Sequence, residues 1–512
     1  MAGAVQNDDA TNGLALHEQY WLTRFAFLRF VGLVYAIAFL ILRDQSGPLI
    51  GAEGLLPAGL YLERVLSASG DRLAAFFAVP TLFWVNCSDA FLQALAYTGL
   101  GASLLVLFGF ANAPLLAGLW FLYLSFVHIG QLFYGYGWEI LLLETGFLAI
   151  FLAPPFDGRP FNVRVPPARA VIWLLRWVLF RVMFGAGLIK LRGDDCWRDL
   201  TCMLYHYETQ PLPNPLSWYL FHLPVAVHKI EVVGNHFVEL VVPWTLFAPR
   251  RIRHVGGLCL VGFQLYLIVS GNLSFLNWLT ITLCIACFDD QALRHLAPAR
   301  LVVRVRQLGR RSPSRARRAV VAALTALVLY LSTTPVMNLL GSRQVMNGSF
   351  DPFDLVNTYG AFGSIGRVRH EVILEGTSDA TITDATRWRE YAFKCQPGDV
   401  NRRPCVVAPY QYRIDWQMWF AAMEDPRANP WLIHFVSQLL ESNAGALSLL
   451  ADDPFPDAPP TFIRAELYEY RFTDWSESTG AWWTRRRVAA YFPPLSRNSP
   501  SVRRFLSRNG LN

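Results

Sequence analysis

Residues 25–42 read Phe-Ala-Phe-Leu-Arg-Phe-Val-Gly-Leu-Val-Tyr-Ala-Ile-Ala-Phe-Leu-Ile-Leu, an apolar run with a single charged residue. A helix of about 20 such residues crosses the roughly 30 Å hydrocarbon core of a bilayer. Apolar residues make up 53% of the 512 residues and charged residues only 16%, whereas charged residues make up about 25% of soluble domains. The run therefore predicts a membrane protein, and further apolar blocks of similar length follow it.

These blocks predict the fold class of the larger part of the chain. We expect a multi-pass α-helical membrane bundle over residues 22–340, with about nine spans. The expected spans are 22–42, 89–110, 114–134, 138–154, 169–190, 229–248, 255–271, 273–288 and 319–340. The fourth and the eighth are short for a full crossing. Residues 1–15 contain no basic residue and no cleavage site follows the first run, which favours an uncleaved first span over a signal peptide.

Arginine is distributed unevenly between the connections. If the N-terminus is cytoplasmic, the cytoplasmic connections hold fifteen arginines, nine of them in 294–318, and the opposite connections hold five. Because cytoplasmic loops carry the excess of Lys and Arg, we place the tail 1–21 and the basic loop 289–318 in the cytoplasm. The loop 191–228 and everything after residue 340 are then non-cytoplasmic. The net charge of +7 is explained by this asymmetry, and nucleic-acid binding is not predicted.

After residue 341 the pattern of apolar residues changes. Residues 368–374 and 462–470 alternate polar and apolar side chains, which predicts strands with one solvated face. Residues 415–423 and 431–450 are typical of helices. We therefore expect a soluble α+β domain over 341–496 on the non-cytoplasmic side, followed by a frayed tail at 497–512.

Five of the eight cysteines fall on the predicted non-cytoplasmic side, where disulfides form. Cys395 and Cys405 flank a turn-rich stretch and predict a disulfide that closes a short loop. Cys196 and Cys202 are expected to pair with each other, or one of them with Cys87. The sequence leaves this choice open.

Polar residues recur inside the predicted spans, where they are costly and normally face the bundle interior. The predicted network comprises Glu231, Asn235, His236, Glu239, Asn272 and Asn277. Glu231, Asn235 and Glu239 lie four residues apart and share one helical face. Two interpretations remain: a structural polar network, or acid–base chemistry for which Lys190, His236 and Glu239 are the catalytic candidates.

The loop 191–228 is the candidate functional surface, because it combines charged and aromatic residues with Pro211, Pro213 and Pro215, which favour extended backbone. It is either a rigid lid at the membrane interface or a surface that binds a client protein. The candidate residues are Asp194, Asp195, Trp197, Arg198, Asp199, His206, Tyr207, Glu208 and Gln210, together with Trp482 and Trp483 of the soluble domain. The spacing of His and acidic residues matches no metal site, and no metal or cofactor is predicted.

Three stretches rich in Trp, His, Cys and Pro occur in a fixed order along the chain. They comprise Gly187-Leu-Ile-Lys-Leu-Arg-Gly-Asp-Asp-Cys-Trp with its continuation to Pro215, then Asn235-His-Phe-Val-Glu with its continuation to Asp290, and then Asn357-Thr-Tyr-Gly, Lys394-Cys-Gln-Pro-Gly-Asp, Asp415-Trp-Gln-Met-Trp and Tyr491-Phe-Pro-Pro. From about residue 17 to residue 496 the chain resembles the lipase maturation factor family. The resemblance implies a protein of the endoplasmic reticulum membrane, with a lumenal C-terminal domain, that helps secreted lipases to fold and to assemble as dimers.

The function implied by the resemblance is a membrane-anchored folding factor, more a chaperone than an enzyme. Its partners would be a secreted lipase or another secreted client, and membrane lipid. The alternative is a membrane-embedded enzyme, since the helical part is also similar to the unit shared with vitamin K-dependent carboxylase. A transporter is disfavoured because no inverted repeat is found. Three lysines against many arginines, alanines and prolines are typical of a high-GC, bacterial source, for which the membrane would be the cytoplasmic one.

Overall fold

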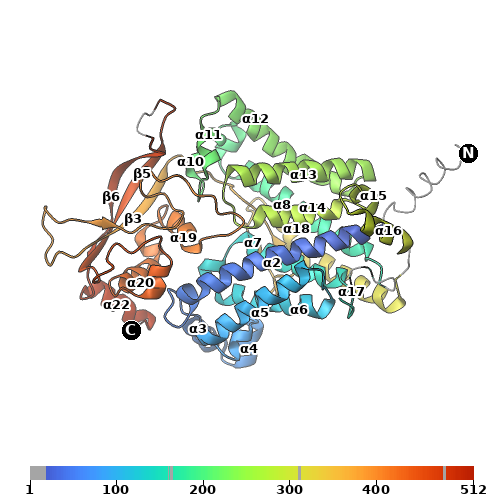
Figure 1. The fold of residues 1–512 in the computed structure, drawn as a ribbon, viewed down its shortest axis with the longest axis horizontal. Coiled ribbons are helices and arrows are strands. Elements are labelled where there is room, and N and C mark those ends of the chain that lie inside the picture. Colours follow the sequence, from blue (N-terminus) through green and yellow to red (C-terminus); the bar gives the residue numbers. More distant parts are fainter. Residues whose placement is uncertain (1–18, 160, 162–164, 309–312, 477–479, 512) are drawn as a thin grey trace, which may run out of the picture.

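The computed structural model describes residues 19–159, 161, 165–308, 313–476 and 480–511. Most of the predicted tail 1–21 and residues 309–312 of the basic loop lie outside these ranges. The described chain forms a bundle of roughly parallel helices with an α+β domain at one end (Figure 1).

Long helices build the bundle, and shorter ones connect them. The long elements are α2 (Trp21–Ile50), α5 (Asp89–Leu107), α6 (Ala113–Ile129), α7 (Gly137–Leu152), α8 (Arg169–Arg192), α12 (Val225–His236), α13 (Arg250–Ser270), α14 (Leu276–Cys284), α17 (Arg315–Leu331) and α18 (Thr333–Leu340). The connecting helices are α3 (Ala58–Ser69), α4 (Arg72–Ala78), α9 (Asp195–Arg198), α10 (Met203–Thr209), α11 (Pro215–Phe221), α15 (Asp290–Leu293) and α16 (Ala299–Leu308).

Five of these helical segments are long and apolar enough to cross a membrane: α2, α5, α8, α13 and the stretch Arg315–Leu340 formed by α17 and α18. Two shorter apolar helical segments, Ala113–Ile129 and Leu276–Cys287, lie among them. The prediction of a helical membrane bundle is thereby confirmed with five candidate spans. The number of nine crossings stays a prediction.

The sixth predicted span is not a continuous α-helix. α12 passes into a π-helical turn, η3 (Phe237–Val241), and then into a 3₁₀ segment, η4 (Val242–Phe247) that begins next to Pro243. Proline cannot donate a backbone hydrogen bond inside a helix, and π turns occur frequently at functional sites. Of the polar residues predicted at this span, Glu239 lies in the π turn, whereas Glu231, Asn235 and His236 lie on α12 before it.

Side chains at the helix starts explain where several helices begin. The Ser88 hydroxyl accepts the backbone N–H of Phe91 at the start of α5, and the Asn112 amide oxygen accepts that of Leu115 at the start of α6. Such caps satisfy backbone N–H groups that have no partner within the helix. Both boundaries agree with the predicted spans to within a few residues.

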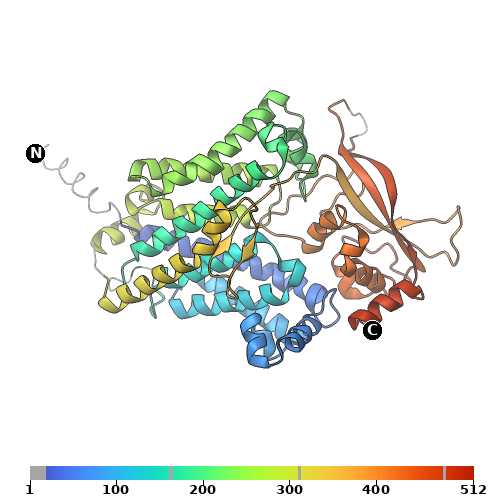
Figure 2. The same ribbon diagram turned by 180° about the vertical axis from the view of Figure 1, so that it is seen from behind.

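The C-terminal domain contains a four-stranded antiparallel sheet in the order β4-β3-β5-β6. Its strands are β3 (Arg369–Thr377), β4 (Arg389–Glu390), β5 (Phe462–Phe472) and β6 (Trp483–Leu495); a separate pair is formed by β1 (Gly348–Ser349) and β2 (Asn357–Thr358). The helices are α19 (Arg413–Ala421), α20 (Pro430–Leu439) and α21 (Ala444–Ser448). α19 lies between the sheet and the bundle (Figures 1 and 2). The predicted strands and helices of an α+β domain are confirmed.

The end of the chain differs from the prediction of a frayed tail at 497–512. Residues Pro500–Asn509 form α22, which packs against α20 and buries Val502. Gly510 ends the helix in the left-handed conformation, which glycine adopts without steric cost. The prediction was wrong because the apolar stripe of this short helix consists of only three residues, Val502, Phe505 and Leu506, among polar ones.

Both predicted disulfides are present. Cys395 and Cys405 are bonded, with their Cα atoms 5.5 Å apart, and Cys196 is bonded to Cys202, with a Cα distance of 4.8 Å. Cys87 is a free thiol. Of the pairings left open for Cys87, Cys196 and Cys202, the structure contains the bond between Cys196 and Cys202.

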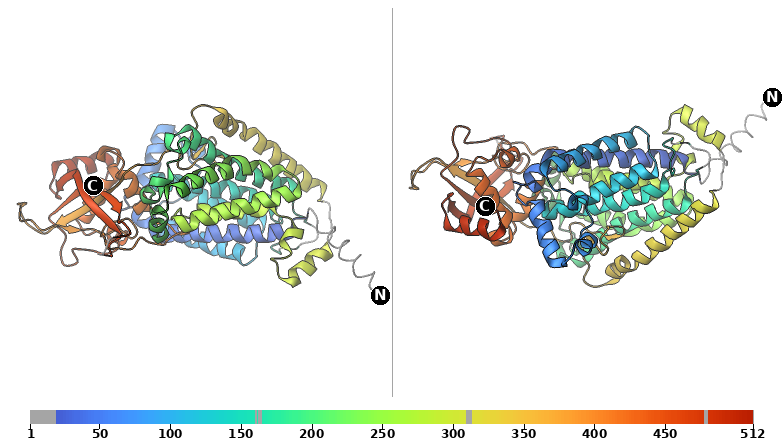
Figure 3. Two further views of the ribbon diagram at one scale, coloured as in Figure 1. Left: turned by 90° about the horizontal axis from the view of Figure 1, so that it is seen from above. Right: turned by 90° about the horizontal axis from the view of Figure 1, so that it is seen from below.

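The two ends of the bundle carry different parts of the chain. The start of α2, the helix α16 and the start of α17 lie at one end, and the C-terminal domain lies at the other (Figure 3). The basic segment and the domain are thus separated by the full length of the bundle.

Candidate functional site at the junction of bundle and domain

A buried ion pair joins the domain to the bundle. Nη1 of Arg413, on α19, lies 2.8 Å from Oε1 of Glu139 on α7, and neither side chain is exposed. Arg413 also donates to the carbonyl of Phe133, and the Tyr123 hydroxyl donates to Glu139. Removing one partner of such a pair is strongly destabilising, so the domain is fixed on the bundle.

A second buried pair lies next to it. Arg181 of α8 is paired with Glu144 of α7, and both side chains are 1% exposed. The hydroxyl of Tyr359 donates to Glu144 over 2.7 Å, and the backbone N–H of Asn357 donates to it over 3.1 Å. The segment that leads into the domain is therefore held by charges inside the bundle.

Arg369, at the start of β3, fastens the loop 191–228 to the domain. Its guanidinium donates to the backbone carbonyls of Glu208, Gln210 and Pro211 and is paired with Glu371. Arg369 is 1% exposed. One arginine thus binds three backbone carbonyls within residues 208–211.

The first part of the same loop is held by residues that precede the sheet. Asp194 caps the short helix α9 and forms an ion pair with Arg367 over 2.7 Å. Burial opposes ionisation of Asp194, but hydrogen bonds from Arg367 and from backbone N–H groups outweigh it and lower its pKa. The Trp197 indole donates to the carbonyl of Phe362. The loop, called the lid below, is therefore held against the domain. Its role as an interfacial lid or as a client surface stays a prediction.

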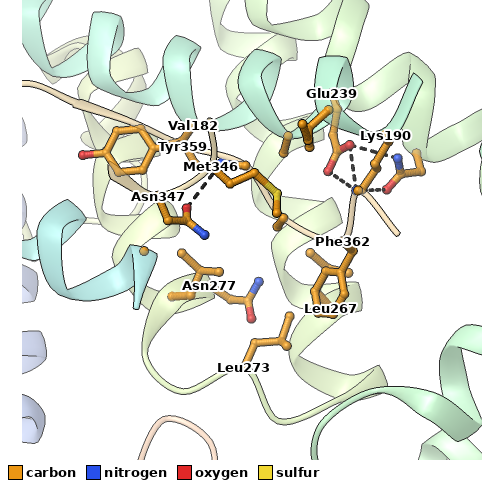
Figure 4. A pocket seen from close by; sticks show the side chains of 18 of the residues that line it. Val182, Lys190, Glu239, Leu267, Leu273, Asn277, Met346, Asn347, Tyr359 and Phe362 are labelled. Atoms are coloured by element: carbon orange, nitrogen blue, oxygen red, sulfur yellow. Dashed lines mark hydrogen bonds and ion pairs between the residues drawn. The ribbon is translucent and has the colours of Figure 1, made fainter. Parts of the chain in front are cut away.

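Lys190 and Glu239 form the polar centre of the junction (Figure 4). Nζ of Lys190 lies 2.6 and 2.8 Å from the two carboxylate oxygens of Glu239 and 3.0 Å from Oδ1 of Asn235. The amide of Asn235 donates to Glu239 in turn. The ammonium also lies 4.9 Å from the centre of the Trp197 ring, a favourable cation–π distance.

A glycine allows the two helices to meet there. A Cβ atom at Gly187 would lie 2.7 Å from the Leu240 side chain and 3.0 Å from Cβ of Glu239. The absence of a side chain at this position lets the π turn approach α8 closely enough for Lys190 to reach Glu239. This explains why glycine stands in the first stretch that carries the family resemblance.

The other predicted network residues form separate clusters. Glu231 accepts from His228 and from the hydroxyls of Tyr207 and Tyr266. His236 is bonded to the carbonyl of Trp197. Asn272 and Asn277 bond to other partners: the segment around Cys405, and Gln264. Lys190 and Glu239 therefore meet as predicted, whereas His236 does not join them by a hydrogen bond.

The structure divides the predicted surface residues into two groups. Asp195, Arg198 and Asp199 are exposed, and Asp194, His206 and Trp482 are partly exposed. Trp197, Tyr207, Glu208, Gln210 and Trp483 are buried. Trp483 stacks on Phe472 inside the domain, so the expectation that it is exposed was wrong. Neighbouring residues of a strand point to opposite faces of the sheet. Trp483 therefore points to the covered face, and the adjacent Trp482 does not.

An exposed aromatic cluster lies beside the lid. Trp218 of α11 contacts Trp475, with ring centres 4.7 Å apart, and Trp482, at 5.9 Å. Tyr219 and His222 complete it. Trp475 is 62% exposed. Exposed aromatic side chains of this kind are typical of binding surfaces.

A cavity of about 490 Å³ lies beside Lys190 and Glu239. Its walls come from α8, α13 and α14 and from the domain, and they include Val182, Leu267, Leu273 and Asn277 (Figure 4). Within the described ranges, no three His, Cys, Asp or Glu side chains are grouped so that they could hold a metal ion.

Sequence reasoning missed the arginines that complete the junction. Arg413, Arg181 and Arg369 are each buried against a carboxylate that lies within an apolar or alternating segment. A carboxylate inside a span requires a partner, which was a usable signal for Glu139 and Glu144. The identity of the partner was not predictable, because Arg413 lies far away in the sequence, in another domain.

A buried carboxylate in the domain gives a pH-dependent prediction. Burial raises the pKa of Asp415 to about 6, although backbone N–H groups of Cys395 and Gln396 stabilise its ionised form. The unfolded chain has the ordinary pKa of about 3.9. The folded state therefore binds this proton more tightly, and its contribution to stability is lost as pH rises from about 4 to about 6, by roughly 1.4 kcal/mol per unit of pKa difference.

Asp415→Asn keeps an acceptor oxygen for both N–H groups but does not ionise. We expect the thermal unfolding midpoint of this variant in detergent to fall less between pH 4 and pH 6 than that of Asp399→Asn, which changes an exposed aspartate nearby. Equal slopes for the two variants would contradict the assignment.

The fold and the junction define a class: a helical membrane protein with a rigidly docked α+β domain. Residues 22–295 match the family described as lipase maturation factor transmembrane domain, and residues 355–493 match the lipase maturation factor C-terminal domain. The chain belongs to the lipase maturation factor family.

Curated relatives are similar over nearly the whole chain. Lipase maturation factor 1 of Bos taurus is 49% identical over 502 residues, which cover 93% of this chain and 90% of that protein. Lipase maturation factor 1 of Homo sapiens is 49% identical over 501 residues, covering 93% and 88%. Lipase maturation factor 2 of Homo sapiens is 31% identical over 611 residues, covering 96% and 85%. No solved structure matches the chain.

Proposed function

We propose that this protein is a membrane-anchored maturation factor for lipases that acts on the non-cytoplasmic side. The observation that carries the proposal is the 49% identity with lipase maturation factor 1 over about nine tenths of both chains. The membrane is that of the endoplasmic reticulum in a eukaryotic host and the cytoplasmic membrane in a bacterial host.

The distribution of charge supports this orientation. The arginine-rich segment lies at the end of the bundle opposite the C-terminal domain. With that segment in the cytoplasm, as the positive-inside rule requires, the domain lies on the other side. The disulfides Cys196–Cys202 and Cys395–Cys405 are then in an oxidising compartment.

The contacts at the polar centre favour a folding factor over an enzyme. All three protons of the Lys190 ammonium are directed at acceptors, two on Glu239 and one on Asn235. A lysine used in this way neither abstracts a proton nor binds a further anion. We therefore assign Lys190 and Glu239 a structural role at the junction.

The rigid junction supports the role in maturation. A client-binding surface that is fixed at the membrane is present at a high effective concentration near a newly translocated chain. The surface that we propose consists of the aromatic cluster of Trp218, Tyr219 and Trp475 with the exposed charged residues Asp195 and Arg198 of the lid. Exposed apolar segments of a partly folded lipase would bind the aromatic rings.

The proposal is tested by complementation. In lipase-secreting cells that lack their own maturation factor, the chain is expected to raise secreted lipase activity per mass of lipase protein, with little change in lipase amount. Glu239→Gln is expected to retain this effect wherever the variant accumulates normally, because the carboxamide still accepts a hydrogen bond from Lys190. Unchanged lipase activity with the wild-type chain would reject the function, and loss of activity in a well-folded Glu239→Gln variant would reject the structural role.

The client surface gives a separate prediction. Trp475→Ala removes the most exposed ring of the cluster and is expected to lower the yield of active lipase about tenfold, as for an interface residue worth 1–2 kcal/mol. Ile382→Ala, which changes another exposed apolar residue of the domain, is the matched control. Co-precipitation of newly made lipase with each variant is the measurement, and equal recovery by both would exclude the cluster.

A further inference from the structure

The cavity at the junction is formed by both parts of the chain. Val182 of α8, Leu267 of α13 and Asn277 of α14 line it from the bundle, and Phe362 and Trp419 line it from the domain. Its volume of about 490 Å³ lies within the range of roughly 300–1,000 Å³ found for small-molecule sites. It is about three times the size of a 150 Å³ apolar cavity that binds benzene.

Most of the cavity wall is apolar, and its ionised groups lie close together. The labelled side chains in Figure 4 show Leu267, Leu273 and Phe362 around the space, with Lys190 and Glu239 at one edge. A space of this composition favours a ligand with a long apolar part. Beside the extracytoplasmic ends of apolar helices, the abundant molecules with such a part are lipids.

The polar edge offers acceptors rather than free charge. The ammonium of Lys190 donates three hydrogen bonds, two to Glu239 and one to Asn235. Glu239 accepts two bonds from Lys190 and one from Asn235, whereas a carboxylate has about four acceptor positions. One acceptor position of Glu239 therefore remains for a ligand that donates a hydrogen bond.

His206 adds a neutral partner at the same edge. It lines the cavity, and burial lowers its pKa to about 4, so its imidazole is uncharged near neutral pH. Its Nδ1 atom is buried and has no hydrogen-bond partner among the described residues. A neutral imidazole offers one donor and one acceptor, which suits a hydroxyl group.

We propose that this cavity binds an uncharged lipid whose head group carries hydroxyls, of which a monoacylglycerol is the simplest case. The hydroxyls bond to Glu239 and His206, and the acyl chain lies along the apolar walls. An anionic head group is excluded because Glu239 already neutralises Lys190, and Glu231, which also lines the cavity, is a second carboxylate. An added negative charge buried there has no counter-ion. The proposal concerns a ligand site and does not rest on the proposed function.

The experiment uses the full chain in phosphatidylcholine nanodiscs and a monoacylglycerol that carries a photoreactive diazirine and an alkyne in its acyl chain. After irradiation, labelled peptides are mapped by mass spectrometry. We expect labels in α8, α13 or the segment 359–364, which line the cavity. Unlabelled 1-monooleoylglycerol is expected to compete at a concentration about tenfold lower than oleate, because the oleate charge would be buried without compensation.

Two variants of one helix separate the cavity from the outer surface. Leu267→Trp fills the cavity, and Leu265→Trp changes a residue of α13 that is 49% exposed on the outside of the bundle. We expect labelling to fall about tenfold in Leu267→Trp and to stay unchanged in Leu265→Trp, because an overfilled site cannot admit the acyl chain. Gel filtration and intact disulfides confirm that both variants are folded.

Three results would overturn the proposal: equal labelling of the two variants, labels confined to the outer bundle surface, or equal competition by oleate. If Leu267→Trp does not fold, the map of labels and the competition with the wild-type chain still decide. None of these readouts depends on lipase activity, so failure of the lipid site is distinguishable from failure of the maturation function.

Discussion

Arg413→Leu is expected to abolish most of the folded protein. The substitution leaves Glu139 buried inside the bundle without a counter-ion, and removal of one partner of a buried pair costs about 3–5 kcal/mol. This is a large part of the 5–15 kcal/mol that stabilises a typical protein. The measurement is the fraction of chain that elutes as a single species after mild detergent extraction, together with its thermal unfolding midpoint.

A second substitution tests the electrostatic cause. In the double variant Glu139→Gln and Arg413→Met, both charges are absent, and we expect much of the folded fraction to return, because replacing a whole buried pair is often nearly neutral. Arg486→Leu, which removes an arginine that is paired with Glu469 and is 73% exposed, should behave as wild type. An Arg413→Leu variant as stable as Arg486→Leu would show that the pair does not hold the domain.

Arg369→Leu is expected to release the lid from the domain. Three backbone carbonyls would lose their donor together, and Glu371 would lose its counter-ion and keep the hydrogen bond from the Gln396 amide. Burial already raises the pKa of Glu371 and Arg369 counteracts this rise, so the variant would bury a carboxylate that tends to bind a proton. We expect a loss of about 3–5 kcal/mol, with hydrogen exchange and proteolysis increasing first between residues 200 and 215.

Arg464→Leu is the control for this loss. Arg464 lies on the neighbouring strand and is paired with Glu375, but its side chain is 29% exposed, against 0% for Arg369, so solvent reaches this pair and its loss is expected to cost less. Arg369→Leu and Arg464→Leu thus remove the same chemical group from one sheet at different burial. Equal protection of the loop in both variants would mean that Arg369 does not fasten it.

The sequence predicted the elements better than it predicted their contacts. The long apolar runs and the alternating segments identified helices and strands, because burial imposes a period on a chain. The local disulfide between Cys395 and Cys405 followed from a short separation and a turn-rich loop. α22 was missed, since it is exposed over most of its surface and its apolar stripe consists of only Val502, Phe505 and Leu506.

The candidate site was predictable only in part. Helical spacing predicted that Asn235 and Glu239 share one face, and the cost of charge in a membrane indicated that Glu239 has a partner inside the bundle. In the structure Lys190 bonds to both residues. Burial of Glu208 and Gln210 was not predictable, because a polar loop residue is buried only when another domain covers it. For Trp483 the alternation of its strand was a usable signal. Asp195 and Arg198, which are exposed, lie in the same loop among similar neighbours. The composition of the loop therefore does not distinguish its exposed residues from its buried ones.

The residues that carry the family resemblance lie at the junction more than on an open surface. Asn357 and Tyr359 bond to Glu144, and Asp194 bonds to Arg367. Asp415 accepts from the backbone of the disulfide-bonded loop at Cys395. The shared motifs of the family therefore describe how the domain is docked, and the client surface is expected in the less distinctive exposed residues beside it.

The buried pair at Arg413 also constrains the synthesis of the protein. Phe133 and Arg413, which meet in the folded chain, are 280 residues apart, so at roughly 5–20 residues per second the ribosome delivers the arginine roughly 15 to 55 seconds after the first helices have formed. During that interval Glu139 is in a half-built bundle without its cation. A protein that assists the folding of others must therefore itself pass through a long unfinished stage, in which the Tyr123 hydroxyl is already available to that carboxylate and the arginine is not.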